Sequence, residues 1–133
     1  MKKLTLLVFT MLFSLCALAV DESKEKPTQH LQVADVQSME EAKAIFIDKT
    51  AEIISKKPLN LENASQIHII TYTLEKSVAY FAENLKGEKQ KLAEKMAVVV
   101  EDIHIASESN KLEALKEHLN KYFDLVDEFI FCF

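Results

Sequence analysis

Two histidines, His68 and His104, are the side chains whose type and spacing point most directly to chemistry. Each lies in a stretch with helical apolar spacing, and Gly87, the only glycine, separates the two stretches. If the two helices are antiparallel about that glycine, the histidines lie at nearly the same level. Imidazoles that project from facing helices are how a helical bundle binds copper or zinc. The spacing therefore makes His68 and His104 candidate metal ligands.

Three further side chains could complete such a site. The same pairing rule, applied to the neighbouring turns, places Asp48 near the level of the histidines and His118 about one helical turn away. Glu101 precedes His104 by three residues and lies on the same helix face. A di-iron carboxylate site would need a matching motif on a second helix, which the sequence does not offer, and covalent haem would need a C-x-x-C-H motif, which is absent.

The alternative interpretation is structural. Both histidines lie at the flank of the apolar stripe of their helix, His68 about 100° from the centre of its stripe by the helical period. Histidines in such boundary positions commonly pack their ring carbons and hydrogen-bond a neighbour. This alternative stays open at the level of the sequence.

The elements that must position these residues are helices. The pattern Ser38-x-x-Glu41 is a capping box for a first helix that ends near Lys56-Lys57-Pro58. Asn60 caps a second helix that ends at Gly87, a third starts near Glu88, and a fourth runs from about Lys111. Their apolar residues recur at helical spacing, and strand patterns are missing. We therefore predict an all-α fold, an up-down-up-down four-helix bundle.

The start of the chain has the pattern of an export signal. Two lysines precede a short apolar run that ends in Ala17-Leu18-Ala19, an A-x-A cleavage site. We predict a cleaved signal peptide at 1–19, a flexible leader at 20–35 and the bundle at 36–133, with the mature protein periplasmic or secreted. A lipoprotein reading at Cys16 is disfavoured because Leu15 is larger than the small residue normally found there.

Composition and charge restrict the function classes. Removal of two lysines with the signal changes the formal charge from −5 to −7, so nucleic acid is a disfavoured partner. No nucleophile with its base and no phosphate-binding glycine loop is present, which predicts that the protein is not an enzyme. Cys132 is the cysteine that remains after cleavage, and it is either a thiol in an apolar terminus or the bridge of a disulfide-linked dimer.

Two segments carry a resemblance to a known group of proteins. The stretch from Ile67 to Glu75, IHIITYTLE, and the stretch from Ile103 to Glu108, IHIASE, resemble segments of a family of short exported bacterial proteins that has no assigned function. The resemblance implies a periplasmic helical protein and supplies no activity, substrate or cofactor. The expected function is thus an exported, non-enzymatic bundle that binds a protein partner in the cell envelope. The alternative is copper or zinc binding through His68 and His104.

Overall fold

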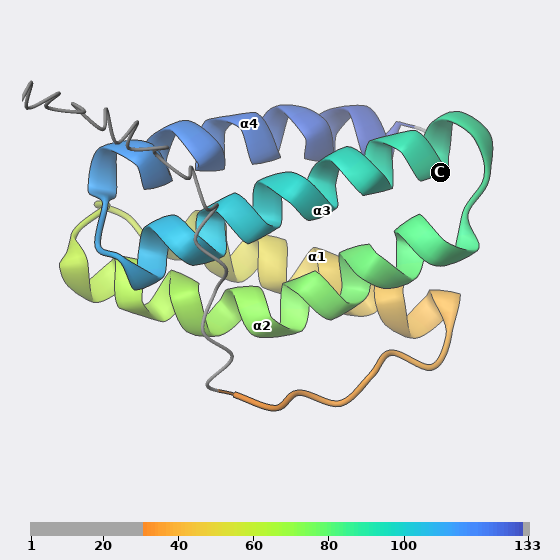
Figure 1. Cartoon of the computed structure of the whole chain (residues 1–133), viewed down its shortest axis with the longest axis horizontal. Coiled ribbons are helices and arrows are strands. Elements are labelled where there is room, and N and C mark those ends of the chain that lie inside the picture. The colour runs from red at the N-terminus through yellow and green to blue at the C-terminus, as the bar shows by residue number, and fades with distance from the viewer. Residues whose placement is uncertain (1–30, 132–133) are drawn as a thin grey trace, which may run out of the picture.

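A computed structural model of the chain describes residues 31–131. In this part of the chain four helices and no strand are present (Figure 1), which confirms the predicted all-α four-helix fold. The helices are α1 (Met39–Ser55), α2 (Leu61–Asn84), α3 (Gly87–Glu108) and α4 (Leu112–Ile130). The predicted signal peptide, residues 20–30 of the predicted leader, and Cys132 lie outside the described residues.

The first two helices begin at the predicted caps. The Ser38 hydroxyl accepts a hydrogen bond from the Glu41 backbone N–H at 3.1 Å, as a capping box requires. The Glu41 carboxylate, however, accepts from the backbone N–H of Gln37 at 2.7 Å, so the return bond reaches one residue further out than the motif predicts. The Asn60 side chain accepts from the Asn63 N–H at 2.8 Å at the start of α2.

Two residues with positive φ lie in the connections that follow α2 and α3. Gly87 has a φ of 65°, the left-handed conformation expected of it, although it opens α3 and α2 already ends at Asn84. The turn predicted from Ser107 to Asn110 is shorter than expected, because α3 continues to Glu108. Asn110, with a φ of 55°, makes the reversal, since asparagine tolerates this conformation better than most residues.

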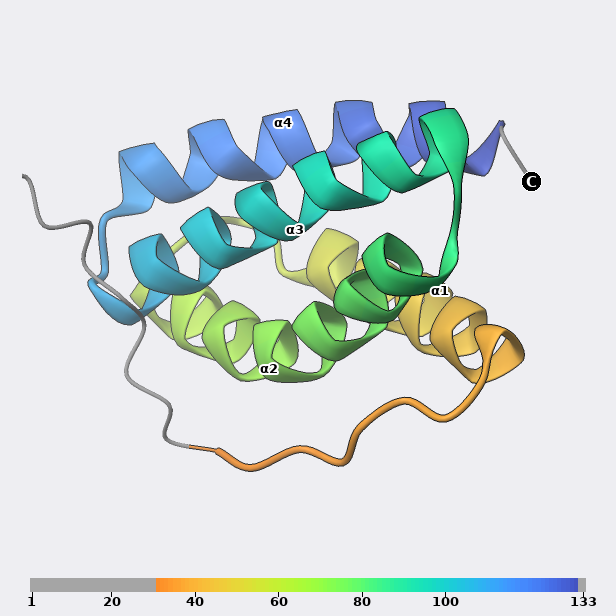
Figure 2. The same ribbon diagram turned by 45° about the vertical axis from the view of Figure 1, so that its right-hand side comes forward.

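Helices that follow each other in the sequence pack side by side and antiparallel (Figures 1 and 2). The first and last helices are different. Although α1 packs on α2, α2 on α3 and α3 on α4, no Cα atom of α1 lies within 8 Å of a Cα atom of α4. The bundle therefore has one wide seam, between α1 and α4.

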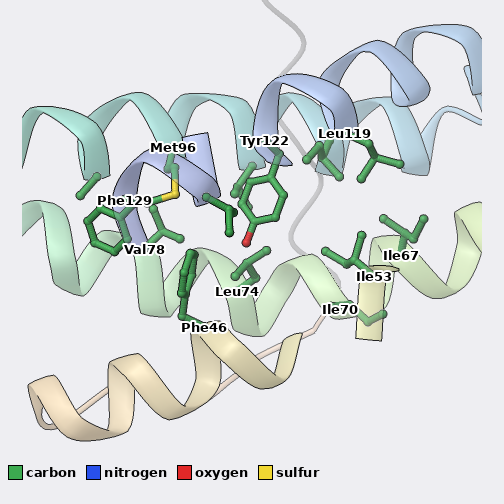
Figure 3. Close-up of a cluster of buried hydrophobic side chains, with 14 of the residues drawn as sticks. Phe46, Ile53, Ile67, Ile70, Leu74, Val78, Met96, Leu119, Tyr122 and Phe129 are labelled. Atoms are coloured by element: carbon green, nitrogen blue, oxygen red, sulfur yellow. The ribbon is translucent and has the colours of Figure 1, made fainter. Parts of the chain in front are cut away.

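Large side chains fill this seam in the core (Figure 3). Phe46 of α1 contacts Tyr122 and Phe129 of α4 edge to face, with ring centroids 6.5 and 5.6 Å apart. Phe81 of α2 lies 5.7 Å from Phe46 and 5.2 Å from Phe129. The seam is thus closed by aromatic rings because the backbones are too far apart for small residues to meet.

One buried hydrogen bond also crosses the seam. The Tyr122 hydroxyl lies 2.6 Å from the Thr50 hydroxyl, and both residues are buried. Burial raises the pKa of Tyr122 well above its ordinary value, an effect that the bond to Thr50 only partly opposes. The phenol therefore stays neutral and the bond is one between two hydroxyl groups.

The residues before α1 follow the outer face of α2, as the orange segment in Figure 1 shows. Val36 is buried, and the Asp35 carboxylate forms an ion pair with Lys76 of α2 at 2.6 Å. The end of the predicted leader therefore contacts the bundle. Of the helices described, none has the length and apolar character needed to span a membrane.

Candidate functional site

The structure brings His68 and His104 together at the interface of α2 and α3. Their ring centroids are 4.7 Å apart, and the ring planes are nearly perpendicular at 80°. Tyr72 lies against both, with ring centroids 4.6 Å from His104 and 5.1 Å from His68. We refer to these three residues and Glu75 as the histidine cluster.

The helical period places three members of the cluster on one face of α2. His68, Tyr72 and Glu75 are separated by four and then three residues, so they follow one another along the face that meets α3. Hydroxyl groups secure the backbone beside the two imidazoles: Thr71 donates to the His68 carbonyl at 2.6 Å and Ser107 donates to the His104 carbonyl at 2.8 Å. The cluster is thus held by rigid elements.

His104 is the most deeply buried polar member. Its side chain is 2% exposed, and its Nδ1 lies 2.7 Å from Oε1 of Glu75, which is 31% exposed. A carboxylate can only accept, so Nδ1 carries a hydrogen, and in the tautomer with this single ring hydrogen Nε2 presents a lone pair. That Nε2 atom is buried and has no hydrogen-bond partner among residues 31–131. A buried acceptor of this kind needs an explanation, because leaving it unsatisfied costs about 1–3 kcal/mol.

This arrangement has the chemistry of a metal-ligating histidine. Such histidines commonly donate one ring N–H to a carboxylate, which fixes the tautomer, orients the ring and makes the other nitrogen a better ligand. The Glu75 carboxylate holds the Nδ1 side of His104 in the same geometry. His68 is half-buried and is thus the more exposed of the two histidines. Its Nε2 lies 3.3 Å from the Tyr72 hydroxyl.

The other predicted ligands do not join the two histidines. Asp48 is exposed on α1, where its carboxylate contacts Lys49 at 3.0 Å, and Glu101 is exposed on α3. His118 lies beside α3, with its Nδ1 3.8 Å from the Asp102 carboxylate. Within residues 31–131 no group of three His, Cys, Asp or Glu side chains is placed to hold one metal ion. The predicted larger ligand sets are therefore not formed, and the candidate site rests on two imidazoles.

The expectation that both histidines sit at a helix flank needs one correction. His104 is fully enclosed, because the flank of α3 that carries it is the side pressed against α2. Tyr72 and Glu75 are not among the site residues predicted from the sequence. Their spacing from His68 was a usable signal, since the three share one helix face, but it does not reveal that Glu75 reaches across to His104.

Residues 1–130 match the model of a protein family described as a family of unknown function (DUF6746). The chain belongs to this family. No curated protein and no solved structure matches the chain. Membership of DUF6746 confirms the predicted resemblance to a family without an assigned function, and its match includes the apolar start of the chain as well as both histidine segments.

Proposed function

We propose that this member of DUF6746 binds one copper or zinc ion through His68 and His104, and that it works by binding rather than by catalysis. The observation that carries the proposal is the buried Nε2 of His104, which lacks a hydrogen-bond partner in the described chain while Glu75 holds Nδ1. A metal ion would satisfy this lone pair.

The proposed donors fit these two metals. Imidazole nitrogen is a good ligand for both copper and zinc, with metal to nitrogen bonds near 2 Å. The rings of His68 and His104 lie 4.7 Å apart between two packed helices, so a second imidazole is adjacent to the one that would hold the ion. The Tyr72 hydroxyl, already near His68, is positioned to accept or donate a hydrogen bond beside that ion.

The small number of protein ligands favours reversible loading. Structural zinc sites use four protein ligands and are closed, whereas two histidines leave coordination positions for water or for a ligand from another molecule. We therefore propose a carrier or buffer of metal ions rather than a protein that needs a metal to fold.

The test is a calorimetric titration of the purified protein with Zn²⁺ and, separately, Cu²⁺. The expected result is binding of one ion, abolished in His68→Ala and in His104→Gln. Glu75→Gln keeps a hydrogen-bond acceptor but removes the charge, and should weaken binding by about 10- to 100-fold, as loss of an outer partner does at other metal sites.

His118→Ala is the matched control, because it removes an imidazole that the structure places beside Asp102 and not in the histidine cluster. It should bind as the unchanged protein does. Circular dichroism of each variant shows whether the bundle still folds. Equal affinity in all the folded histidine variants would refute the site.

We also propose that the protein acts in the periplasm or is secreted. The support is the basic and apolar start that ends at Ala17-Leu18-Ala19. Mass spectrometry of the protein recovered from the periplasm or the culture medium should show a first residue of Val20. Recovery of the whole chain from the cytoplasm alone would contradict this.

A second candidate function is binding of a protein partner through an apolar edge. Ile47 on α1 is 66% exposed and Ile130 at the end of α4 is 53% exposed, and both line a hollow of about 200 Å³ over Phe46. Apolar side chains grouped on a surface are a common mark of protein interaction sites. Capture of a defined envelope protein by the unchanged chain, and its loss with Ile47→Glu, would favour this function; equal capture by both would contradict it.

A further inference from the structure

A second hollow lies at the other end of the seam, where the end of α1 faces the first half of α4. It encloses about 260 Å³. Its floor is apolar, with Ile53 and Leu119 buried and Leu59 and Phe123 half-buried. Around it lie Asn120 and three lysines, Lys56, Lys57 and Lys116.

The charge of this hollow contrasts with the rest of the protein. The chain carries a formal charge of −5, yet the charged residues that line the hollow are three lysines, with no acidic residue among the lining side chains. In the described chain none of these three ammonium groups forms an ion pair, whereas Lys49 and Lys76 do. The hollow is therefore a local positive site with unneutralised charge.

The helix dipole explains the positions of only two of these three lysines. Lys56 and Lys57 follow the last residue of α1, where cations are stabilised by the negative end of the helix. Lys116 belongs to the first half of α4, near the positive end of that helix, so the same effect does not favour it there. Its position across the seam from the other two lysines is what makes the group converge on one space.

We propose that this hollow binds a monomeric medium-chain fatty acid, with the carboxylate among Lys56, Lys57 and Lys116 and the chain on the apolar floor. Charge complementarity selects an anion, and the apolar floor selects an alkyl chain. The volume is slightly below the 300–1,000 Å³ typical of small-molecule sites, which suits one short chain better than a two-chain lipid. The site is separate from the histidine cluster and does not depend on metal binding.

The experiment is a calorimetric titration of the full chain with decanoate, beside the neutral analogue 1-decanol. Saturable binding of decanoate that is clearly tighter than that of 1-decanol is expected, and added salt should weaken it. Lys116→Gln should weaken decanoate binding by about tenfold, the loss expected when one charge-assisted hydrogen bond disappears. The triple variant Lys56→Gln, Lys57→Gln, Lys116→Gln should bind decanoate no better than 1-decanol.

The matched control is Lys86→Gln, which removes an exposed lysine at the opposite end of the bundle, between α2 and α3. It should bind decanoate as the unchanged protein does. Sedimentation with phosphatidylglycerol vesicles separates a free fatty acid from a membrane surface, and no co-sedimentation is expected. The proposal is overturned by lack of saturable decanoate binding, by equal affinity for 1-decanol, by equal weakening in Lys86→Gln, or by binding to vesicles alone.

Discussion

Removal of the Tyr122 hydroxyl tests how the wide seam between α1 and α4 is held. Tyr122→Phe keeps the ring and its contacts with Phe46, and it deletes only the oxygen that meets Thr50 at 2.6 Å. Both residues are buried, so water does not replace the lost phenol oxygen. The Thr50 hydroxyl is then left without this hydrogen-bond partner. An unsatisfied buried hydroxyl costs about 1–3 kcal/mol.

The two sides of this bond should not be equally sensitive. A threonine hydroxyl in a helix can turn to a carbonyl one turn earlier, so Tyr122→Phe should cost about 1 kcal/mol, at the low end of that range. The Tyr122 phenol has no such nearby carbonyl on α4, because its oxygen reaches across the seam. Thr50→Val should therefore cost more, about 2 kcal/mol. In a domain of this size, 1 kcal/mol corresponds to a decrease of about 4–8 °C in Tm.

The double variant separates the hydrogen bond from general packing. With both hydroxyl groups replaced by apolar groups of similar shape, nothing polar is left unsatisfied, and the double variant should be more stable than Thr50→Val alone. Urea denaturation followed by far-ultraviolet circular dichroism gives the free energy of unfolding of all four proteins. If the cost of the double variant equals the sum of the two single costs, the bond contributes nothing and the reasoning is wrong.

Three further predictions concern single features of the fold. Burial raises the pKa of Tyr122 above the ordinary value of 10.0. The contribution of the neutral Tyr122 phenol to the free energy of unfolding is therefore complete below pH 10 and is lost as the pH rises toward the folded-state pKa. The free energy of unfolding of Tyr122→Phe should accordingly fall less steeply above pH 10 than that of the unchanged protein. Gly87→Ala should lower the free energy of unfolding, measured in urea, by about 1–2 kcal/mol, because a φ of 65° disfavours residues with a side chain. An added Cβ would meet no atom within 4 Å, so the cost comes from the backbone alone, and Gly87→Asn should cost less. The hydrogen bond and charge of Lys76 lower the pKa of Asp35 below 3.8, and an NMR titration of Lys76→Gln should show it return toward that value; an unchanged titration would contradict the contact.

Much of the fold follows from local patterns in the sequence. The caps at Ser38 and Asn60, the single glycine and the helical spacing of the apolar residues each depend on a few neighbouring positions. Helix number and direction could therefore be predicted. The ends of α2 and α3 could not be placed to the residue, because α2 ends at Asn84, before the predicted glycine, and α3 continues to Glu108, into the predicted turn.

The candidate site was partly predictable for the same reason. Pairing about Gly87 places His68 and His104 at one level, because antiparallel neighbours joined by a short turn keep a nearly fixed register. The same rule gives the level of Asp48 and His118, but the side chains of these two residues do not join the histidine cluster. The level of a residue along the bundle does not give the direction of its side chain around the helix axis. The Asp48 carboxylate contacts Lys49, and the His118 ring lies beside Asp102.

The sequence by itself determined four helices, their order and the shared level of two histidines, because these depend on helical periodicity and on short connections. Tertiary packing decided which helix flanks are enclosed. It buried His104 against α2, turned Glu75 toward its Nδ1, and left α1 and α4 far enough apart for Tyr122 to reach Thr50 and for three lysines to surround one apolar hollow. These features depend on the rotation of each helix about its axis and on the distance between helices, and both are set by how all the side chains of the core pack together.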